Sequence, residues 1–106
     1  MIPQTPPDAI APEDCLTMSE VRTAVDTLDR EVVALLARRF AYMRAAARIK
    51  PTRDAVRDEA RKAAVIAAVR TEAQRLGAPG ERIAALWEQL VESSIAYELE
   101  QWDAKL

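Results

Sequence analysis

The chain has 106 residues, enough for one domain, and half of them are hydrophobic although only 5% are aromatic. A net charge of −2 and a pI near 5.2 argue against a nucleic-acid partner, and no apolar run approaches the roughly 18 residues of a membrane span. The chain has no histidine, the most common general base and metal ligand, so we expect no metal and no other cofactor.

The first 16 residues carry four prolines and no hydrophobic periodicity, which predicts a flexible N-terminal arm over 1–16 and a helical domain over 17–104. The N-terminus lacks the basic start and apolar core of a signal peptide. The single cysteine, Cys15, cannot form an internal disulfide and, without histidine, makes a poor nucleophile. We therefore expect a cytoplasmic protein.

Many alanines, two glycines and few aromatics favour an all-α fold. Thr17 and Glu20 form a capping-box pattern that starts the first helix near Met18. The apolar periodicity lasts to Ile49, and Pro51 disfavours helical backbone at the residue before it. This predicts a helix over 18–49, about 32 residues and roughly 48 Å long.

Two further helices follow. We expect the second over 57–76, ended by Gly77, and the third from Pro79 and Gly80 to about residue 102. The predicted inner face of the third helix consists of Ile83, Trp87, Leu90, Ser94, Tyr97 or Glu98, and Gln101.

The first helix is too long for a compact domain of this size, whose radius of gyration would be near 13 Å. Its apolar stripe consists of Val21, Val25, Leu28, Val32, Leu35, Arg39, Tyr42, Ala46 and Ile49. A stripe of this length would be an aggregation liability without a partner chain. We therefore expect a two-fold homodimer.

Arg39 interrupts this stripe where an apolar residue is expected, and Lys50 follows about three turns, or roughly 16 Å, later. Two such long cationic side chains could bracket a ligand. Arg22 is about 25 Å from Arg39 along the helix, too far to reach the same small molecule unless it comes from a partner chain.

Further polar residues accompany these cations. Ser94 and Glu98 share a face of the third helix at i, i+4, and Asp58 and Arg61 lie at the start of the second helix. A pocket of this composition suits a small molecule with two carboxylates.

The spacing of these residues is equally compatible with purely structural roles that involve no ligand. Arg39 could form a salt bridge with Glu98 or Glu92. Lys50 is favoured at a helix C-terminus without any ligand, and Ser94 could bond back to its own helix. The aromatic residues Trp87, Tyr97 and Trp102 are expected to be packing residues.

Taken together, the charged positions form a pattern across all three predicted helices. The pattern comprises Val21-Arg22, Asp26, Leu28-Asp29, residues 35–39 and residues 48–50 in the first helix, Val56-Arg57-Asp58 and Arg61 before and in the second, and Ser94 and Glu98 in the third. It covers about residues 13–102 and resembles the all-helical chorismate mutase family.

The resemblance implies an intertwined, domain-swapped homodimer with two shared sites, and a cofactor-free rearrangement of chorismate to prephenate in the shikimate pathway. It assigns the substrate carboxylates to Arg22 of the partner chain, Arg39 and Ser94, the ether oxygen to Lys50 and Glu98, the substrate hydroxyl to Asp58, and support of the pocket to Arg61. Since a carboxylate has no hydrogen to donate, Glu98 would act only when protonated, so we expect mutase activity to rise toward acid pH.

Two features separate the chain from well-studied bacterial mutases. Lys62 stands where they carry a glutamate that holds the substrate hydroxyl. Residues 12–15 and 95–102 resemble the branch that includes isochorismate pyruvate lyase, which serves salicylate and siderophore synthesis. The alternatives to a chorismate mutase are that lyase activity, a related mutase acting on amino-substituted chorismate, and a non-catalytic helical dimer.

Overall fold

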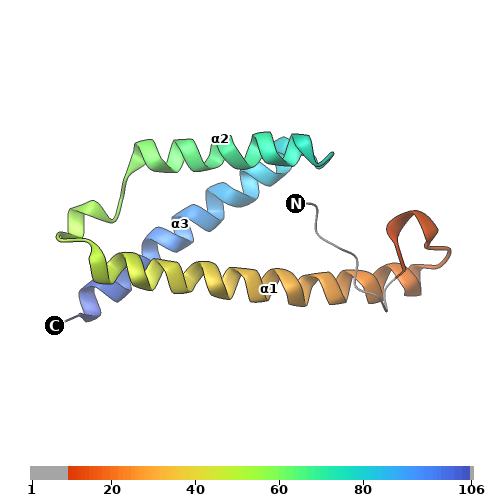
Figure 1. Ribbon diagram of the computed structural model, residues 1–106, viewed down its shortest axis with the longest axis horizontal. Helices are drawn as coiled ribbons and strands as arrows, with labels where there is room; N and C mark the ends of the chain where they lie inside the picture. Colours follow the sequence, from red (N-terminus) through yellow and green to blue (C-terminus); the bar gives the residue numbers. More distant parts are fainter. Residues whose placement is uncertain (1–9, 106) are drawn as a thin grey trace. The chain divides into compact units, whose positions relative to one another are not determined.

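The computed structural model describes residues 10–105, and these contain helices and no β-strand (Figure 1). In chain order they are η1 (Pro12–Asp14), α1 (Met18–Ile49), η2 (Arg53–Ala55), α2 (Glu59–Arg75) and α3 (Gly80–Ala104), where η denotes a 3₁₀ turn. The prediction of an all-α chain with three long helices is confirmed. Within the same residues, no helix has both the length and the apolar character to cross a membrane.

Helix α1 has the predicted bounds because local signals fix both of its ends. Glu20 accepts hydrogen bonds from the backbone N–H groups of Leu16 and Thr17 at 2.9 and 3.0 Å, and the Thr17 hydroxyl accepts one from the Glu20 N–H at 3.2 Å. The capping box is therefore formed, and the Leu16 N–H bond is the main cause of a lowered pKa at Glu20. The other end lies just before Lys50 and Pro51.

The chain divides after Arg39, inside α1, into two compact units. In the first unit the apolar stripe of α1 is exposed on the single chain, at 46% for Val25, 50% for Val32 and 59% for Leu35. The predicted arm over 1–16 stays a prediction, because residues 1–9 lie outside the described part of the chain. Residues 10–16 contain the turn η1.

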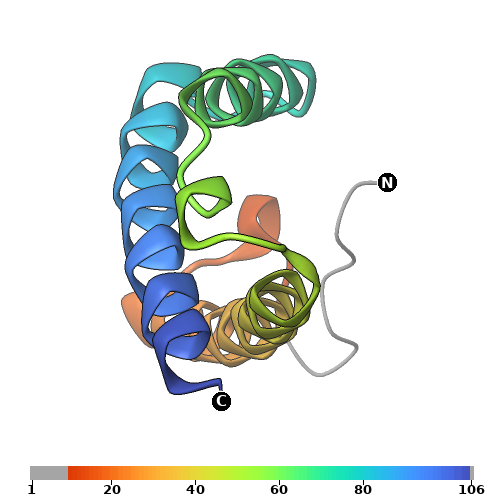
Figure 2. The ribbon, with the colours of Figure 1, turned by 90° about the vertical axis from the view of Figure 1, so that its left-hand side faces the viewer.

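In the second unit, α2 and α3 are joined by a short turn and pack against each other (Figures 1 and 2). Their core is small. Val56, Val91 and Ile95 are buried, and the half-buried residues Val65, Trp87, Leu99 and Trp102 pack around them. The expected packing roles of Trp87 and Trp102 are confirmed.

Helix α2 begins two residues later than predicted because Asp58 is its N-cap. The Asp58 carboxylate accepts a hydrogen bond from the backbone N–H of Arg61 at 2.9 Å, so Arg57 and Asp58 precede the helix. At the other end Gly77 adopts φ +76°, the left-handed conformation expected of a residue just past a helix. Helix α3 extends two residues beyond the predicted end, to Ala104.

The last part of α1 belongs to the second unit and contacts α3 there. The rings of Phe40 and Tyr97 meet edge to face with centroids 5.2 Å apart, and Arg44 donates a hydrogen bond to the Tyr97 hydroxyl at 3.0 Å. Ala47 is 2% exposed. These contacts confirm the packing role expected for Tyr97, and they bring the end of α1 beside the C-terminal half of α3.

Candidate active site

The structure joins two of the predicted site residues in an ion pair. Lys50 follows α1 directly, and its Nζ lies 2.6 Å from Oε2 of Glu98 on α3. The contact is ionic and lacks the alignment of a hydrogen bond. The same ammonium reaches the Val56 carbonyl at the longer distance of 3.5 Å. The partner of Glu98, which the sequence left open, is therefore this lysine.

Burial makes this pair asymmetric, because the Glu98 side chain is 5% exposed and the Lys50 side chain 29%. A buried carboxylate is costly unless a cation or hydrogen-bond donors compensate for its lost hydration. Removing the cation from a buried pair costs about 3–5 kcal/mol in general, since the remaining charge has no partner. The position of Lys50 is therefore coupled to that of Glu98.

Ser94 lies one turn before Glu98 and is buried at 3% exposure. The inward orientation predicted for both residues is confirmed. Ala84, Val91 and Ile95 are buried with them, and the other predicted inner-face residues are half-buried: Ile83, Trp87, Leu90 and Gln101. The Ser94 hydroxyl donates to the Leu90 carbonyl at 2.7 Å, as the structural reading of this residue expected.

The two arginines predicted to bind carboxylates, Arg22 and Arg39, both lie on α1 in the first unit. Arg22 is exposed and Arg39 is half-buried. Their roles in a site stay predictions.

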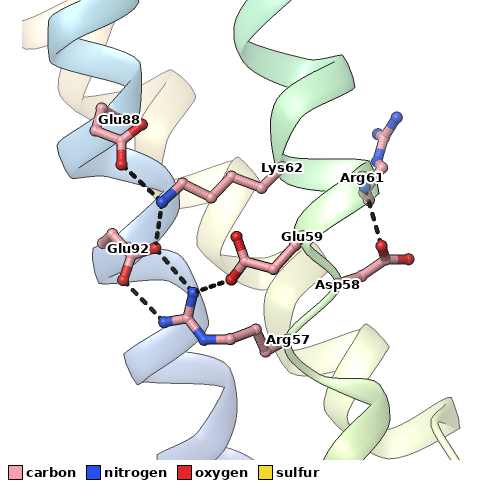
Figure 3. A network of polar contacts seen from close by, with 7 residues as sticks. All are labelled: Arg57, Asp58, Glu59, Arg61, Lys62, Glu88 and Glu92. Atoms are coloured by element: carbon pink, nitrogen blue, oxygen red, sulfur yellow. Dashed lines mark hydrogen bonds and ion pairs between the residues drawn. The ribbon is translucent and has the colours of Figure 1, made fainter.

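A network of ion pairs connects the start of α2 to the middle of α3 (Figure 3). Glu92 accepts two hydrogen bonds from Arg57 at 2.8 and 3.1 Å and one from Lys62 at 2.7 Å. Lys62 also lies 2.6 Å from Glu88, and Arg57 lies 2.8 Å from Glu59. Both cations are thus shared between two acids.

These contacts shift the pKa values of the network in the directions expected for ion pairs. The hydrogen bonds from Arg57 and then Lys62 lower the pKa of Glu92 to about 2. Hydrogen bonds to Glu88 and then Glu92 raise the pKa of Lys62, and the Glu92 bond raises that of Arg57. All three groups therefore stay charged through the neutral range.

The network also places the other predicted residues at the start of α2. The Lys62 ammonium is directed at the two acids of α3, whereas the Arg61 guanidinium points away from them (Figure 3). Asp58 caps α2, a role that sequence analysis missed although aspartate is among the preferred N-cap residues. The predicted residues of α2 are thus not gathered at the Lys50–Glu98 pair by any of these contacts.

Sequence analysis also missed the contacts around the turn that carries Lys50. Lys105 donates to the carbonyls of Ala47 and Lys50, and Arg53 pairs with Asp103. No periodicity could have identified them, because the partners are 50 or more residues apart in the sequence. A shallow groove of about 290 Å³ lies nearby, lined by Arg44, Ala47, Arg48, Gln101, Ala104 and Lys105. It includes neither Lys50 nor Glu98, so it is not the predicted substrate pocket.

Chemically, the Lys50–Glu98 pair can position a polar molecule and stabilise negative charge on one of its oxygens. An ammonium has three N–H donors, so it can face Glu98 and still donate to a bound oxygen. Such an arrangement favours reactions whose barrier falls through orientation and fixed charge.

Comparison with known proteins gives two findings. The sequence model of the family described as chorismate mutase type II matches residues 21–99. The chain is also 31% identical over 91 residues to an isochorismate pyruvate lyase from Pseudomonas aeruginosa, and the match covers 86% of this chain and 90% of that protein. Both matches span all three long helices.

Proposed function

The chain belongs to the chorismate mutase type II family, and on that premise we propose that it catalyses the cofactor-free rearrangement of chorismate to prephenate. The observation that carries the proposal is the Lys50–Glu98 pair, 2.6 Å apart, at the two positions that the family pattern assigns to the ether oxygen of the substrate. The family and the lyase relative together indicate an enzyme of chorismate mutase or isochorismate pyruvate lyase type.

In the proposed reaction the ether carbon–oxygen bond breaks while a carbon–carbon bond forms between the enolpyruvyl methylene and the ring. Lys50 donates to the ether oxygen as its bond breaks, and Glu98 donates to the same oxygen when it carries a proton. The shift is pericyclic, so electrons move around one ring of bonds and no nucleophile, base or metal is required. The protein lowers the barrier by holding the reactive conformer and by stabilising charge on the oxygen. Such chemistry suits a chain without histidine.

Arg39, Ser94 and Arg22 of a second copy complete the proposed pocket by binding the two carboxylates, with Asp58 at the hydroxyl and Arg61 in support. Arginine suits this role because its guanidinium matches a carboxylate with two parallel hydrogen bonds. Lys62, the remaining predicted member, already has its ammonium paired with Glu88 and Glu92.

The second copy is itself part of the proposal. Leu35, Tyr42 and Ile49 on the stripe of α1 are 59%, 67% and 71% exposed on the single chain, which supports an intertwined homodimer that covers them. Sedimentation of the purified chain tests this directly, and Leu35→Glu should shift the population toward monomer. A wild-type chain that stays monomeric at micromolar concentration would contradict the shared site.

Isochorismate pyruvate lyase activity is the second candidate, favoured by the relative that is 31% identical over 86% of this chain. The same cations would hold isochorismate. Cleavage of the corresponding ether bond, with transfer of the hydrogen on the neighbouring, hydroxyl-bearing ring carbon to the enolpyruvyl methylene, would release salicylate and pyruvate. The two candidates differ only in substrate and product, so geometry at Lys50 and Glu98 serves both.

Purified protein incubated separately with chorismate and isochorismate decides between them. Prephenate from chorismate supports the mutase, and salicylate with pyruvate from isochorismate supports the lyase. Lys50→Met should reduce whichever activity is present by at least about a hundredfold, the scale of losing one transition-state donor. If neither substrate is turned over, the chain is a non-catalytic helical dimer and the proposed function is wrong.

A further inference from the structure

The turn that carries Lys50 is held by the C-terminal end of α3. Lys105, the residue that follows α3, donates through its ammonium to the Ala47 carbonyl at 2.9 Å and to the carbonyl of Lys50 itself at 3.2 Å. The last carbonyls of a helix lack partners within it and carry partial negative charge. A cation at this position therefore fixes the end of α1.

Lys105 is in turn kept in place by α3. Its ammonium lies 4.6 Å from the centroid of the Trp102 ring, within the range of a cation–π contact. Trp102 packs against the core cluster of Val56, Val91 and Ile95. The contact to the Lys50 carbonyl is thus anchored on the most buried part of the second unit.

A second contact holds the same turn three residues further on. The Arg53 guanidinium donates two hydrogen bonds to the Asp103 carboxylate at 2.8 and 3.1 Å. The pair lowers the pKa of Asp103 and raises that of Arg53, chiefly through these hydrogen bonds. The two side chains are about half exposed, so this pair orients the turn more than it stabilises the fold.

The two contacts hold the turn at residues 50 and 53. Lys105 binds the Lys50 carbonyl and Asp103 binds Arg53, while the Lys50 ammonium lies against Glu98 of α3. In reactions governed by positioning, displacement of a catalytic group by about 1 Å can cost a hundredfold in rate.

We infer that residues 102–105 position Lys50, so that Lys105 and Asp103 are positioning residues for the reaction. This inference rests on the proposed function, because it takes Lys50 as the donor to the substrate. Neither side chain needs to contact the substrate. Their effect passes through the backbone of residues 50–53 to the Lys50 ammonium.

The test uses the full-length chain and its preferred substrate. Lys105→Met removes the two carbonyl contacts but keeps an unbranched side chain, and Asp103→Asn removes the charge of the second contact. We expect Lys105→Met to lower kcat by about threefold to a hundredfold with a smaller change in KM, Asp103→Asn to have a weaker effect, and Lys105→Arg to restore most of the rate. Arg82→Met and Glu100→Gln, at exposed positions of α3, are the matched controls and should leave kcat unchanged.

A double-mutant cycle distinguishes positioning from general structural support. If Lys105 acts through Lys50, Lys105→Met should cost nothing further in the Lys50→Met background, where the residual rate no longer depends on that ammonium. Independent, additive losses in the two backgrounds would overturn the inference. So would an unchanged kcat in Lys105→Met.

Hydrogen exchange provides a readout that does not require activity. The amides of Lys50, Ala55 and Val56 are bonded within this turn or to the end of α1, whereas the amide of Lys62 is bonded at the start of α2. Lys105→Met should accelerate exchange at the first three and leave the fourth unchanged. Acceleration at all four would show general destabilisation and overturn the inference. A wild-type chain inactive on both substrates would overturn the proposed function, and the exchange comparison would then still test whether Lys105 holds the turn of Lys50.

Discussion

Glu98→Gln is the change that most directly tests the proposed chemistry. The Glu98 carboxyl lies 2.6 Å from the Lys50 ammonium and its side chain is 5% exposed. An ionised carboxylate can only accept hydrogen bonds, so it cannot donate to the ether oxygen, whereas the amide of glutamine donates at every pH. The substitution keeps the size of the side chain and removes its titration.

The expected effect is a difference between two pH profiles. Because only a protonated carboxyl can donate, the rate of the unmodified chain should rise toward acid pH. The glutamine variant should vary by less than about twofold between pH 5 and 9, because the donor is always present. At neutral pH it should therefore be faster than the unmodified chain.

The same change should cost stability, because Lys50 exchanges a charged partner for a neutral one. The ion pair is partly exposed on the Lys50 side, so we expect a loss of about 1 kcal/mol, the upper end of the range for exposed ion pairs. This is less than the cost of leaving a buried charge unpaired, since the amide oxygen can still accept from the ammonium. Glu100→Gln, the same substitution at an exposed position of α3, should change neither stability nor the pH profile.

The assay is the initial rate of chorismate loss at saturating substrate between pH 5 and 9, at one protein concentration throughout because the proposed dimer would make the active fraction depend on concentration. An optimum above neutrality in the unmodified chain would refute the reasoning. An equally steep pH dependence in the glutamine variant would refute it as well, since the titrating group would then lie elsewhere.

Three further predictions concern stability. The pKa of Glu92 is lowered to about 2 in the folded chain, so its ion pairs stabilise the fold at pH values above the ordinary pKa of glutamate, and this contribution is lost as the pH falls toward 2. In urea titrations, Glu92→Gln should therefore lower the free energy of unfolding at pH 7 and change it little at pH 2. Asp58→Ala removes the N-cap of α2 and should lower the free energy of unfolding by about 1 kcal/mol, whereas Asp58→Asn should retain most of it. Gly77→Ala meets no neighbouring atom but must adopt φ near +76°, so it should cost about 1 kcal/mol, and an unchanged unfolding midpoint would show that this turn relaxes.

The parts of the fold that sequence alone could predict are those fixed by neighbouring residues. The bounds of α1 follow from the Thr17–Glu20 capping box and from Pro51, all within a few residues of the helix ends. The start of α2 was predicted two residues early because hydrophobic periodicity does not reveal which of several polar residues will serve as the cap. Helix α3 extends past its predicted end, where the turn of Lys105 back to α1 is a tertiary contact.

In the candidate site too, sequence alone could predict only what depends on neighbouring residues. Ser94 and Glu98 could be placed on one inward face because i, i+4 spacing is a property of a single helix. The partner of Glu98 could not be derived in this way, since Lys50 is 48 residues away and several cations were available to pair with it. Distances between helices decide such pairings, and periodicity carries no information about them.

Lys62 departs from the pattern of bacterial mutases, and its contacts within the chain explain it. Judged against bacterial mutases, a lysine at this position reverses a charge that would otherwise meet the substrate hydroxyl. In the structure that lysine lies between Glu88 and Glu92, and its partly buried ammonium is compensated from α3 alone. Glu92 is shared with Arg57, which precedes α2. The lysine is therefore accounted for by the packing of α2 on α3 without any ligand, so its charge alone does not identify the substrate.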